Sequence, residues 1–251
     1  MTAAFRSGWG LARSLAIYRF RPWQIAALAQ FYRGFVAPGD VAFDIGAHVG
    51  NRTLALRRAG ARVVAVEPQG LFHGFLRRTL PGDVTLLRVA VGAEPGEAAL
   101  AVSRLHPTVS SLRADYPQAV GAAEGFEHVA WDAAETVAVT TLDALIAAHG
   151  HPRFVKIDVE GYEAEALAGL SEPVACVAFE YLPAALDVAA AAVARLEALG
   201  RYRFNLIRGE GDSFALADWV DGPSLLAALG DIARDNRSGD VYARLTEEGQ
   251  P

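Results

Sequence analysis

Lysine is almost absent from this sequence of 251 residues, because Lys156 is its single lysine and arginine supplies the other basic side chains. An ammonium group is a compact, strongly hydrated charge on a flexible stem, and a planar guanidinium does not replace it in a confined site. The segment around Lys156 is therefore a candidate functional site. Cysteine is equally scarce. Cys176 alone excludes an internal disulfide framework and, in the apolar run 174–179, is expected to be buried, so a reducing cytoplasm is the expected location.

Long apolar runs are missing as well. No window approaches the ~20 apolar residues of a membrane span, and Arg6, Arg13 and Arg19 interrupt the start of the chain, which excludes the apolar core of a secretory signal. A net charge of −6 argues against a nucleic-acid partner, which would require a basic face. The 52% of apolar residues suffices for a full core, and the length fits one α/β domain.

Short apolar runs of β type alternate with helical patterns along the chain. This alternation predicts βαβ units, and therefore an α/β fold with a mostly parallel sheet. The expected strands are 41–45, 62–66, 84–89, 155–157, 174–179, 202–206 and 241–245. The expected helices are 51–58, 71–79, 187–199 and one that Thr140 caps and that ends at His149.

Two regions do not follow this alternation. Residues 1–38 carry an aromatic-rich helical pattern and are expected to form an N-terminal helical extension that caps the sheet or covers the active site, before a main domain at 39–251. Residues 103–136 contain proline and glycine without a period, which is typical of a functional loop or lid. The extension and the alanine-rich helix 187–199 are also candidate dimer contacts, so a homo-oligomer stays open.

A nucleoside site is predicted where the first two strands end. The first strand runs into Asp44, the chain turns at Gly46, Gly50 opens a helix, and the second strand ends at Glu67. The glycines would let a ligand approach the backbone, and Glu67 is placed to accept both hydroxyls of a ribose. The dinucleotide pattern G-x-G-x-x-G is incomplete, with His48 in its turn. Since Asp44 would repel a phosphate, the cationic S-adenosylmethionine is a better match than a dinucleotide.

A second group of charged residues follows the strand that contains Lys156. Asp158 and Glu160 lie at its carboxyl end, where ligands bind in open α/β sheets. If the strand persisted to Glu160, all three side chains would project to the same side. Alternatives stay open: Lys156 in a structural ion pair with Asp158 or Glu180, Glu160 at the start of the next helix, and a divalent metal held by Asp158, Glu160 and Glu180. The main expectation is a site without metal.

Six motifs occur in the order known from one enzyme family. They are DIGAHVGNRT (44–53), VVAVEP (63–68), VAVG (89–92), VTTLDAL (139–145), VKIDVEGYEAEALAGL (155–170) and VAFE (177–180). With them the chain resembles the FkbM family of class I S-adenosylmethionine-dependent methyltransferases over about 35–245. Two departures are Gln69, where such proteins often carry asparagine, and the individual loop 103–136.

The resemblance implies a doubly wound, seven-stranded sheet whose last strand is antiparallel, and methyl transfer to a hydroxyl of a small molecule such as a natural product, sugar or glycan. It implies a cofactor site made of Asp44, Gly46, His48, Gly50, Asn51, Thr53, Glu67 and Ala90. The candidate catalytic residues are Asp158, as base or acceptor-orienting group, with Lys156 and Glu160. Two other functions stay open, a nicotinamide-dependent Rossmann oxidoreductase and a catalytically silent binding protein with the methyltransferase fold.

Overall fold

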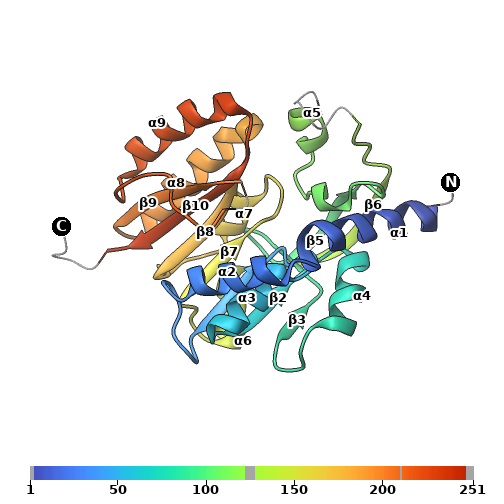
Figure 1. The fold of residues 1–251 in the computed structure, drawn as a ribbon. Coiled ribbons are helices and arrows are strands. Elements are labelled where there is room, and N and C mark those ends of the chain that lie inside the picture. The colour runs from blue at the N-terminus through green and yellow to red at the C-terminus, as the bar shows by residue number, and fades with distance from the viewer. Residues whose placement is uncertain (1–2, 122–127, 210, 247–251) are drawn as a thin grey trace.

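A seven-stranded sheet forms the centre of the computed structural model, which describes residues 3–121, 128–209 and 211–246 (Figure 1). Its strands lie in the order β3-β2-β1-β7-β8-β10-β9. β10 is antiparallel to both of its neighbours, and the other pairs are parallel. The predicted α/β fold with a mostly parallel seven-stranded sheet is therefore confirmed. The bounds are β1 Val41–Ile45, β2 Arg62–Val66, β3 Thr85–Leu87, β7 Phe154–Ile157, β8 Cys176–Tyr181, β9 Tyr202–Arg208 and β10 Gly239–Leu245.

Different helices cover the two faces of this sheet. Alternate side chains of a strand point to opposite faces. In β1, Phe43 and Ile45 pack into a core with α6 to α9, whereas Ala42 packs into a second core with α2 and α3. Each buried aromatic or large aliphatic side chain stabilises the fold by about 1.5–3 kcal/mol. The helices are α2 Pro22–Tyr32, α3 Asn51–Ala59, α4 Gly70–Thr79, α6 Leu142–His149, α7 Glu163–Ala168, α8 Leu186–Leu199 and α9 Gly222–Ile232.

One predicted helix start is wrong by one position. Thr140 is the last residue of β6, and the side chain of Thr141 accepts the hydrogen bond from the backbone N–H of Ala144. Both residues are threonines, so the sequence pattern alone does not distinguish them. The neighbouring strand decides the choice, because Thr140 is paired with Val91 in the sheet.

A second, three-stranded sheet lies in the order β4-β6-β5, with bounds Ala90–Val91, Ala133–Thr140 and Gly96–Val102. β6 begins inside the predicted loop 103–136, which also contains the short helices η2 (Pro107–Val109) and α5 (Tyr116–Val120). The expectation of an aperiodic segment is thus wrong at its end, where small and polar residues hide the strand pattern. Residues 122–127 of that segment lie outside the described residues. A lid function stays a prediction.

The N-terminal extension contains α1 (Ala3–Ser14), the π-helix η1 (Leu15–Arg19) and α2. The side chain of Tyr32 in α2 is fully buried against Phe154, with ring centroids 5.4 Å apart. Further upstream, the ring of Tyr18 meets that of His48 at 5.3 Å. The extension therefore both covers a sheet face and reaches the site described below. Among the described helices, none combines the length and the apolar character that crossing a membrane requires.

Candidate functional site

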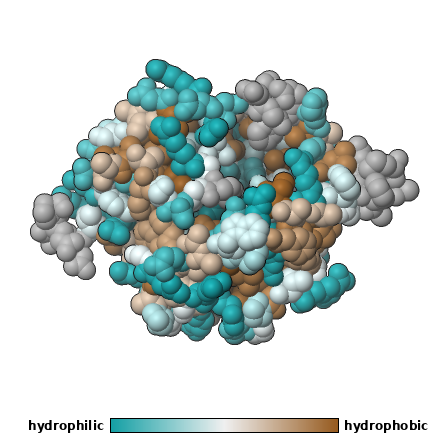
Figure 2. All heavy atoms as spheres, in the orientation of Figure 1, coloured by the Kyte–Doolittle hydropathy of each residue, from teal (hydrophilic) through white to brown (hydrophobic). Residues whose placement is uncertain are grey.

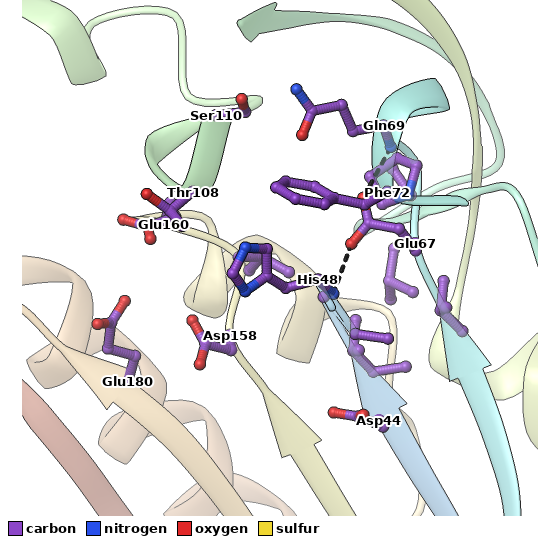
Figure 3. A pocket seen from close by; sticks show the side chains of 18 of the residues that line it. Asp44, His48, Glu67, Gln69, Phe72, Thr108, Ser110, Asp158, Glu160 and Glu180 are labelled. Carbon is purple, nitrogen blue, oxygen red and sulfur yellow. Dashed lines mark hydrogen bonds between the residues drawn. The ribbon is translucent and has the colours of Figure 1, made fainter. Parts of the chain in front are cut away.

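A cavity of about 280 Å³ lies where strands β1, β2, β7 and β8 end in their carboxyl direction (Figure 3). The β1–α3 turn, the end of β2 and the end of β7 form its floor, and residues 107–110 lie across from them. Figure 3 shows Asp158, Glu160 and Glu180 on one side of His48, and Glu67, Gln69 and Phe72 on the other. The cavity thus joins the two groups of residues that the sequence singles out.

Asp44, at the end of β1, is a buried carboxylate on the wall of this cavity. The hydroxyl of Thr53 in α3 donates a hydrogen bond to Asp44 Oδ2. Burial raises the pKa of Asp44, and this hydrogen bond opposes the rise. Thr53 itself is completely buried and does not line the cavity. The structure therefore gives Thr53 a positioning contact with Asp44.

The two glycines of the β1–α3 turn are required by the protein's own packing. Gly46 has φ +85°, and a Cβ there would collide with the carbonyl oxygen of Asp158. Gly50 has φ +79°, and a Cβ there would lie 2.8 Å from Leu76 Cδ2. These contacts are a second reason for the glycines, and the predicted one, room for a ligand, stays a prediction. Gly46 still lines the cavity, whereas Gly50 does not.

Glu67, at the end of β2, is held by the backbone. Its Oε2 accepts from the N–H of His48 and its Oε1 from the N–H of Gln69, both at 2.8 Å. Burial raises the pKa of Glu67 to about 8 despite these donors. Each carboxylate oxygen can accept more than one hydrogen bond. The fixed carboxylate therefore retains acceptor capacity toward the cavity.

His48 presents its ring to the cavity between two aromatic side chains. Its ring centroid lies 4.3 Å from that of Phe72 and 5.3 Å from that of Tyr18, both edge to face. Among the described residues, His48 Nε2 has no hydrogen-bond partner although it is buried. Burial lowers the pKa of His48 to about 4, so the ring is neutral at pH 7. Phe72 and Tyr18 were not predicted as site residues, although Phe72 lies in the helix that follows Glu67.

Lys156 lies behind the cavity wall, not in it. Its side chain is fully buried, and Nζ lies 2.8 Å from Asp240 Oδ1 and 3.4 Å from Asp158 Oδ2. Arg52 binds the other oxygen of Asp240 at 3.0 Å. The sequence suggested Asp158 or Glu180 as ion-pair partners, but Asp240 is the main one. No local sequence pattern identifies Asp240 as the partner of Lys156, because the two residues are 84 positions apart in the sequence.

Asp158, Glu160 and Glu180 converge at the ends of β7 and β8. One carboxylate oxygen from each lies within 4.8 Å of the other two, a grouping able to hold a cation. Glu180 Oε2 is buried and has no partner among the described residues. Burial, followed by repulsion from neighbouring carboxylates, raises the pKa of Glu160 to about 8 and that of Glu180 well above its usual range. Glu180 ends the motif VAFE, so the strand-end rule applied to β8 would have found it.

β7 ends at Ile157, so the strand does not persist to Glu160 as the simple alternation required. Glu160 has φ +55°, and its carbonyl and carboxylate are held from the 107–120 segment: Ser111 Oγ donates to its carbonyl oxygen and Tyr116 Oη to its Oε2, both at 2.6 Å. Glu160 does not start the next helix. Glu163 takes that role, because its Oε1 accepts from the N–H groups of Val159 and Gly161.

The charge on the cavity wall restricts its ligand. Five carboxylates line the described cavity, at Asp44, Glu67, Asp158, Glu160 and Glu180. The basic side chains among its described lining residues are Arg52, which is engaged with Asp240, and neutral His48. Burial and the neighbouring carboxylates raise the pKa values of Glu67, Glu160 and Glu180, which shows that additional negative charge is unfavourable in this cavity. A diphosphate would therefore be disfavoured, whereas a cationic ligand would favour the ionised forms of these side chains. A ligand with ribose hydroxyls, an ammonium and a sulfonium, as in S-adenosylmethionine, fits this set of acceptors.

The structure brings most of the predicted site residues together on one wall. Those that line the cavity are Asp44, Gly46, His48, Asn51, Glu67, Ala90, Asp158 and Glu160. Gly50, Thr53 and Lys156 lie behind it. Their predicted binding and catalytic roles stay predictions.

The chain matches the Methyltransferase FkbM domain over residues 44–187. Its fold is similar to three solved structures at low identity. An O-methyltransferase from Bacillus cereus in complex with SAH is 13% identical, covers 97% of this chain and 90% of its own, and has a TM-score of 0.47. A TehB-like SAM-dependent methyltransferase from Corynebacterium glutamicum is 11% identical, with coverage of 98% and 100% and a TM-score of 0.49. Magnesium protoporphyrin IX methyltransferase from Synechocystis with bound SAM is 10% identical, with coverage of 94% and 84% and a TM-score of 0.45.

No curated protein matches the chain. The domain match alone spans more than half of the sequence and includes the motifs that carry the resemblance. It confirms the predicted methyltransferase class and the predicted cofactor, S-adenosylmethionine. The chain belongs to the FkbM methyltransferase domain family.

Proposed function

We propose that this methyltransferase transfers the methyl group of S-adenosylmethionine to a hydroxyl oxygen of a small polyhydroxylated acceptor, such as a sugar, a glycan or a natural product. The observation that carries this proposal is the convergence of Asp158, Glu160 and Glu180 within 4.8 Å on the wall of the cavity that also holds Asp44 and Glu67. Carboxylates accept hydrogen bonds from hydroxyl groups, and charge-assisted bonds of this kind are about twice as strong as neutral ones. Three hydrogen-bond-accepting side chains in one place suit a methyl acceptor that carries several hydroxyl groups.

The cofactor half of the cavity is the part around β1 and β2. When bound, S-adenosylmethionine supplies an electrophilic methyl group. Glu67, fixed by the N–H groups of His48 and Gln69, is proposed to accept the ribose hydroxyls. Asp44, fixed by Thr53, is proposed to face the ammonium of the amino acid portion. Asn51 and Ala90 complete this part of the wall.

The acceptor half is the part around β7 and β8. An alcohol must lose its proton as its oxygen gains the methyl group, and a positioned carboxylate can take that proton. Asp158 is the first candidate, because its side chain lines the cavity, is 29% exposed and stands directly after β7. General-base assistance contributes about 10²- to 10⁴-fold. Alignment of the oxygen with the methyl group contributes several kcal/mol more.

Lys156 acts in this scheme as a positioning residue. Its ammonium lies 3.4 Å from Asp158 Oδ2 but has no exposed surface from which to contact an acceptor. The ion pair with Asp240 holds Nζ in place. Lys156 thereby fixes the orientation of Asp158.

The test is methyl transfer from S-adenosylmethionine carrying a ¹³C-labelled methyl group to a panel of sugars, glycosides and polyhydroxylated natural products. The chemical shift of the labelled carbon distinguishes O-methyl from N-methyl and C-methyl products. We expect an O-methyl product, and we expect Asp158→Asn to form it far more slowly. A product methylated on carbon or nitrogen would contradict the proposed oxygen acceptor.

The two alternative functions, an oxidoreductase and a catalytically silent binding protein, would give different results in thermal unfolding experiments. An oxidoreductase would be stabilised against heat by NAD(H) and not by S-adenosylhomocysteine, and the five carboxylates of the cavity disfavour that outcome. A catalytically silent protein would bind cofactor poorly. Thermal unfolding with each compound therefore separates all three functions before an acceptor is known.

A further inference from the structure

The charges of this chain are divided unequally along the sequence. Before Asp40 the chain contains arginines at positions 6, 13, 19, 21 and 33, and no aspartate or glutamate. All 29 acidic residues of the chain therefore lie from Asp40 onward. The charged side chains before Asp40 are thus all cationic, whereas the given sequence as a whole has a net charge of −6. Such asymmetry between two parts of a chain is typical of proteins that meet an anionic surface.

The same segment also carries large apolar side chains that are exposed. Among the described residues, the large hydrophobic side chains that are left exposed are Trp9 (61%), Phe20 (67%) and Trp23 (67%). All three are close in sequence, in α1, directly after η1 and in α2. Figure 1 shows α1 and α2 at the front of the molecule, and the same view in Figure 2 shows brown apolar side chains there among teal hydrophilic ones.

The helix formed by α1 and η1 has an inner and an outer side. Gly10, Ser14 and Tyr18 recur at helical spacing on the inner side: Gly10 and Ser14 are buried, and Tyr18 lines the site cavity. A Cβ at Gly10 would lie 2.6 Å from Pro107 Cδ, so the packing on that side is close. Trp9 and Phe20 are separated by about three turns of an α-helix, with exposed Arg13 between them. The inner side of this helix thus already packs against the rest of the protein. The aromatic side chains therefore lie on its outer side, where they face solvent.

We propose that the aromatic–arginine surface, formed by Trp9, Arg13, Phe20, Arg21 and Trp23, binds the surface of an anionic lipid membrane. Tryptophan and phenylalanine insert into the boundary between head groups and acyl chains, and arginines bind anionic head groups. No carboxylate before Asp40 opposes this attraction. The helix would lie on the membrane, in agreement with the finding that no described helix is suited to cross it.

Charge also distinguishes the membrane from other occupants. A second copy of the chain meeting this surface through two-fold symmetry would bring arginines against arginines, with no acidic residue on the surface to pair with them. A nucleic acid is bound mainly through many phosphate contacts. Here Arg19 is engaged internally, since its guanidinium donates to the carbonyl oxygens of Val49 and Gly50 at 3.2 Å. Few arginines of this segment therefore remain to bind the phosphates of a nucleic acid. Three large apolar side chains lie beside them, and this combination suits a lipid surface.

A second cavity adjoins the site cavity and is lined in part by Arg13 of this surface. It has a volume of about 160 Å³ and lies between α1–η1 and residues 105–109. Tyr18, Pro107, Thr108 and Val109 line both this cavity and the site cavity. If the proposed hydroxyl methylation is correct, an acceptor attached to a lipid would reach the carboxylates of the site from the side of this second cavity. Membrane binding itself does not depend on that function.

The test is co-sedimentation of the full chain with vesicles of phosphatidylcholine alone and of equal parts phosphatidylcholine and phosphatidylglycerol. We expect binding to the anionic vesicles at least about 10-fold stronger than to the neutral ones, weakening as salt is added. The triple variant Trp9→Ala, Phe20→Ala, Trp23→Ala should lose at least about 10-fold in binding. Arg21→Gln should lose about 5-fold. Arg153→Gln changes an exposed arginine directly before the central strand β7, at the amino end of that strand and thus away from the cavity, and should leave binding unchanged.

The controls separate this proposal from the proposed function. Each variant should keep the unfolding temperature and the S-adenosylhomocysteine affinity of the parent, because the changed side chains are exposed or half-buried. Vesicle binding needs neither cofactor nor acceptor, so it succeeds or fails independently of methyl transfer. Equal vesicle binding by parent and triple variant would overturn the proposal. So would binding to duplex DNA, or a dimer that the triple variant abolishes, in the absence of vesicle binding.

Discussion

The ammonium of Lys156 and the carboxylate of Asp240 lie 2.8 Å apart across an intervening strand. Lys156 is in β7 and Asp240 is in β10, with β8 between them. Ala178 of β8 is directly opposite Lys156 in the register, and its small side chain leaves the room that the lysine stem needs. The single lysine of the chain thus connects the parallel strands to the antiparallel one beneath the acceptor half of the cavity.

Lys156→Met should lower the free energy of unfolding by about 3–5 kcal/mol, because it leaves the buried carboxylate of Asp240 with Arg52 as its remaining ion-pair partner. Denaturant titration measures this loss. The matched control is the double variant Lys156→Met, Asp240→Asn, which removes both charges and should recover part of the stability. A loss below about 1 kcal/mol in the single variant would show that the ion pair has no structural importance.

Glu67 should make the protein less stable as pH rises. Burial raises its pKa to about 8 in the fold, whereas an unfolded glutamate titrates near about 4.3. Since the folded pKa is above the unfolded one, the contribution is fully present below about pH 4 and is lost as pH rises to about 8. Without cofactor, Glu67→Gln should therefore gain stability relative to the parent by a few kcal/mol between pH 5 and pH 8. Denaturant titrations at those two pH values measure the difference, and parallel pH curves for the two proteins would contradict it.

Tyr116→Phe should shift the pH dependence of activity. The phenol donates a hydrogen bond of 2.6 Å to Glu160 Oε2 and so favours the ionised form of that carboxylate. Removing it should raise the pKa of Glu160, and the ascending limb of the kcat/KM profile should move up by about one pH unit. Tyr162→Phe, whose phenol lies outside the cavity, is the control. An unmoved limb in Tyr116→Phe would exclude Glu160 from the ionisation that limits activity.

Asp158→Asn should reduce kcat by about 10²- to 10⁴-fold and leave cofactor affinity nearly unchanged, because the amide cannot take the proton of the acceptor. Steady-state kinetics and cofactor titration separate the two effects. Glu165→Gln, an exposed acid on α7, should behave like the parent. Activity that survives in Asp158→Asn but disappears with a chelator would replace the base mechanism by a metal held by the three carboxylates.

Two central strands were predictable to the residue, whereas the buried strand β8 was predicted two residues too early. β1 and β2 begin and end where the sequence indicated, because their apolar runs are continuous. The strand β6 was not found, since alanine, threonine and glutamate dominate it and only Val137 is buried. The partner of Lys156 was not predictable either. Asp240 reaches it through the antiparallel return of β10, a relationship between strands that no local pattern carries.

The site, too, was predictable only where a local sequence pattern determines the position of a side chain. Asp44 and Glu67 follow from the rule that ligands bind at the carboxyl ends of strands. The position of Glu160 does not, because a left-handed residue after β7 turns its carboxylate toward the cavity and Ser111 and Tyr116 hold it there. Those two residues belong to the segment that showed no period in the sequence.

The role of the cavity as the cofactor site is tested most directly by isothermal titration of S-adenosylhomocysteine into the parent protein and into Glu67→Ala. We expect micromolar binding by the parent and a loss of about 10- to 100-fold in the variant, equal to one or two charge-assisted hydrogen bonds. Equal affinity in the two proteins would remove Glu67 from the cofactor site. Binding of NAD(H) by a parent that does not bind S-adenosylhomocysteine would contradict the assignment of the cavity itself.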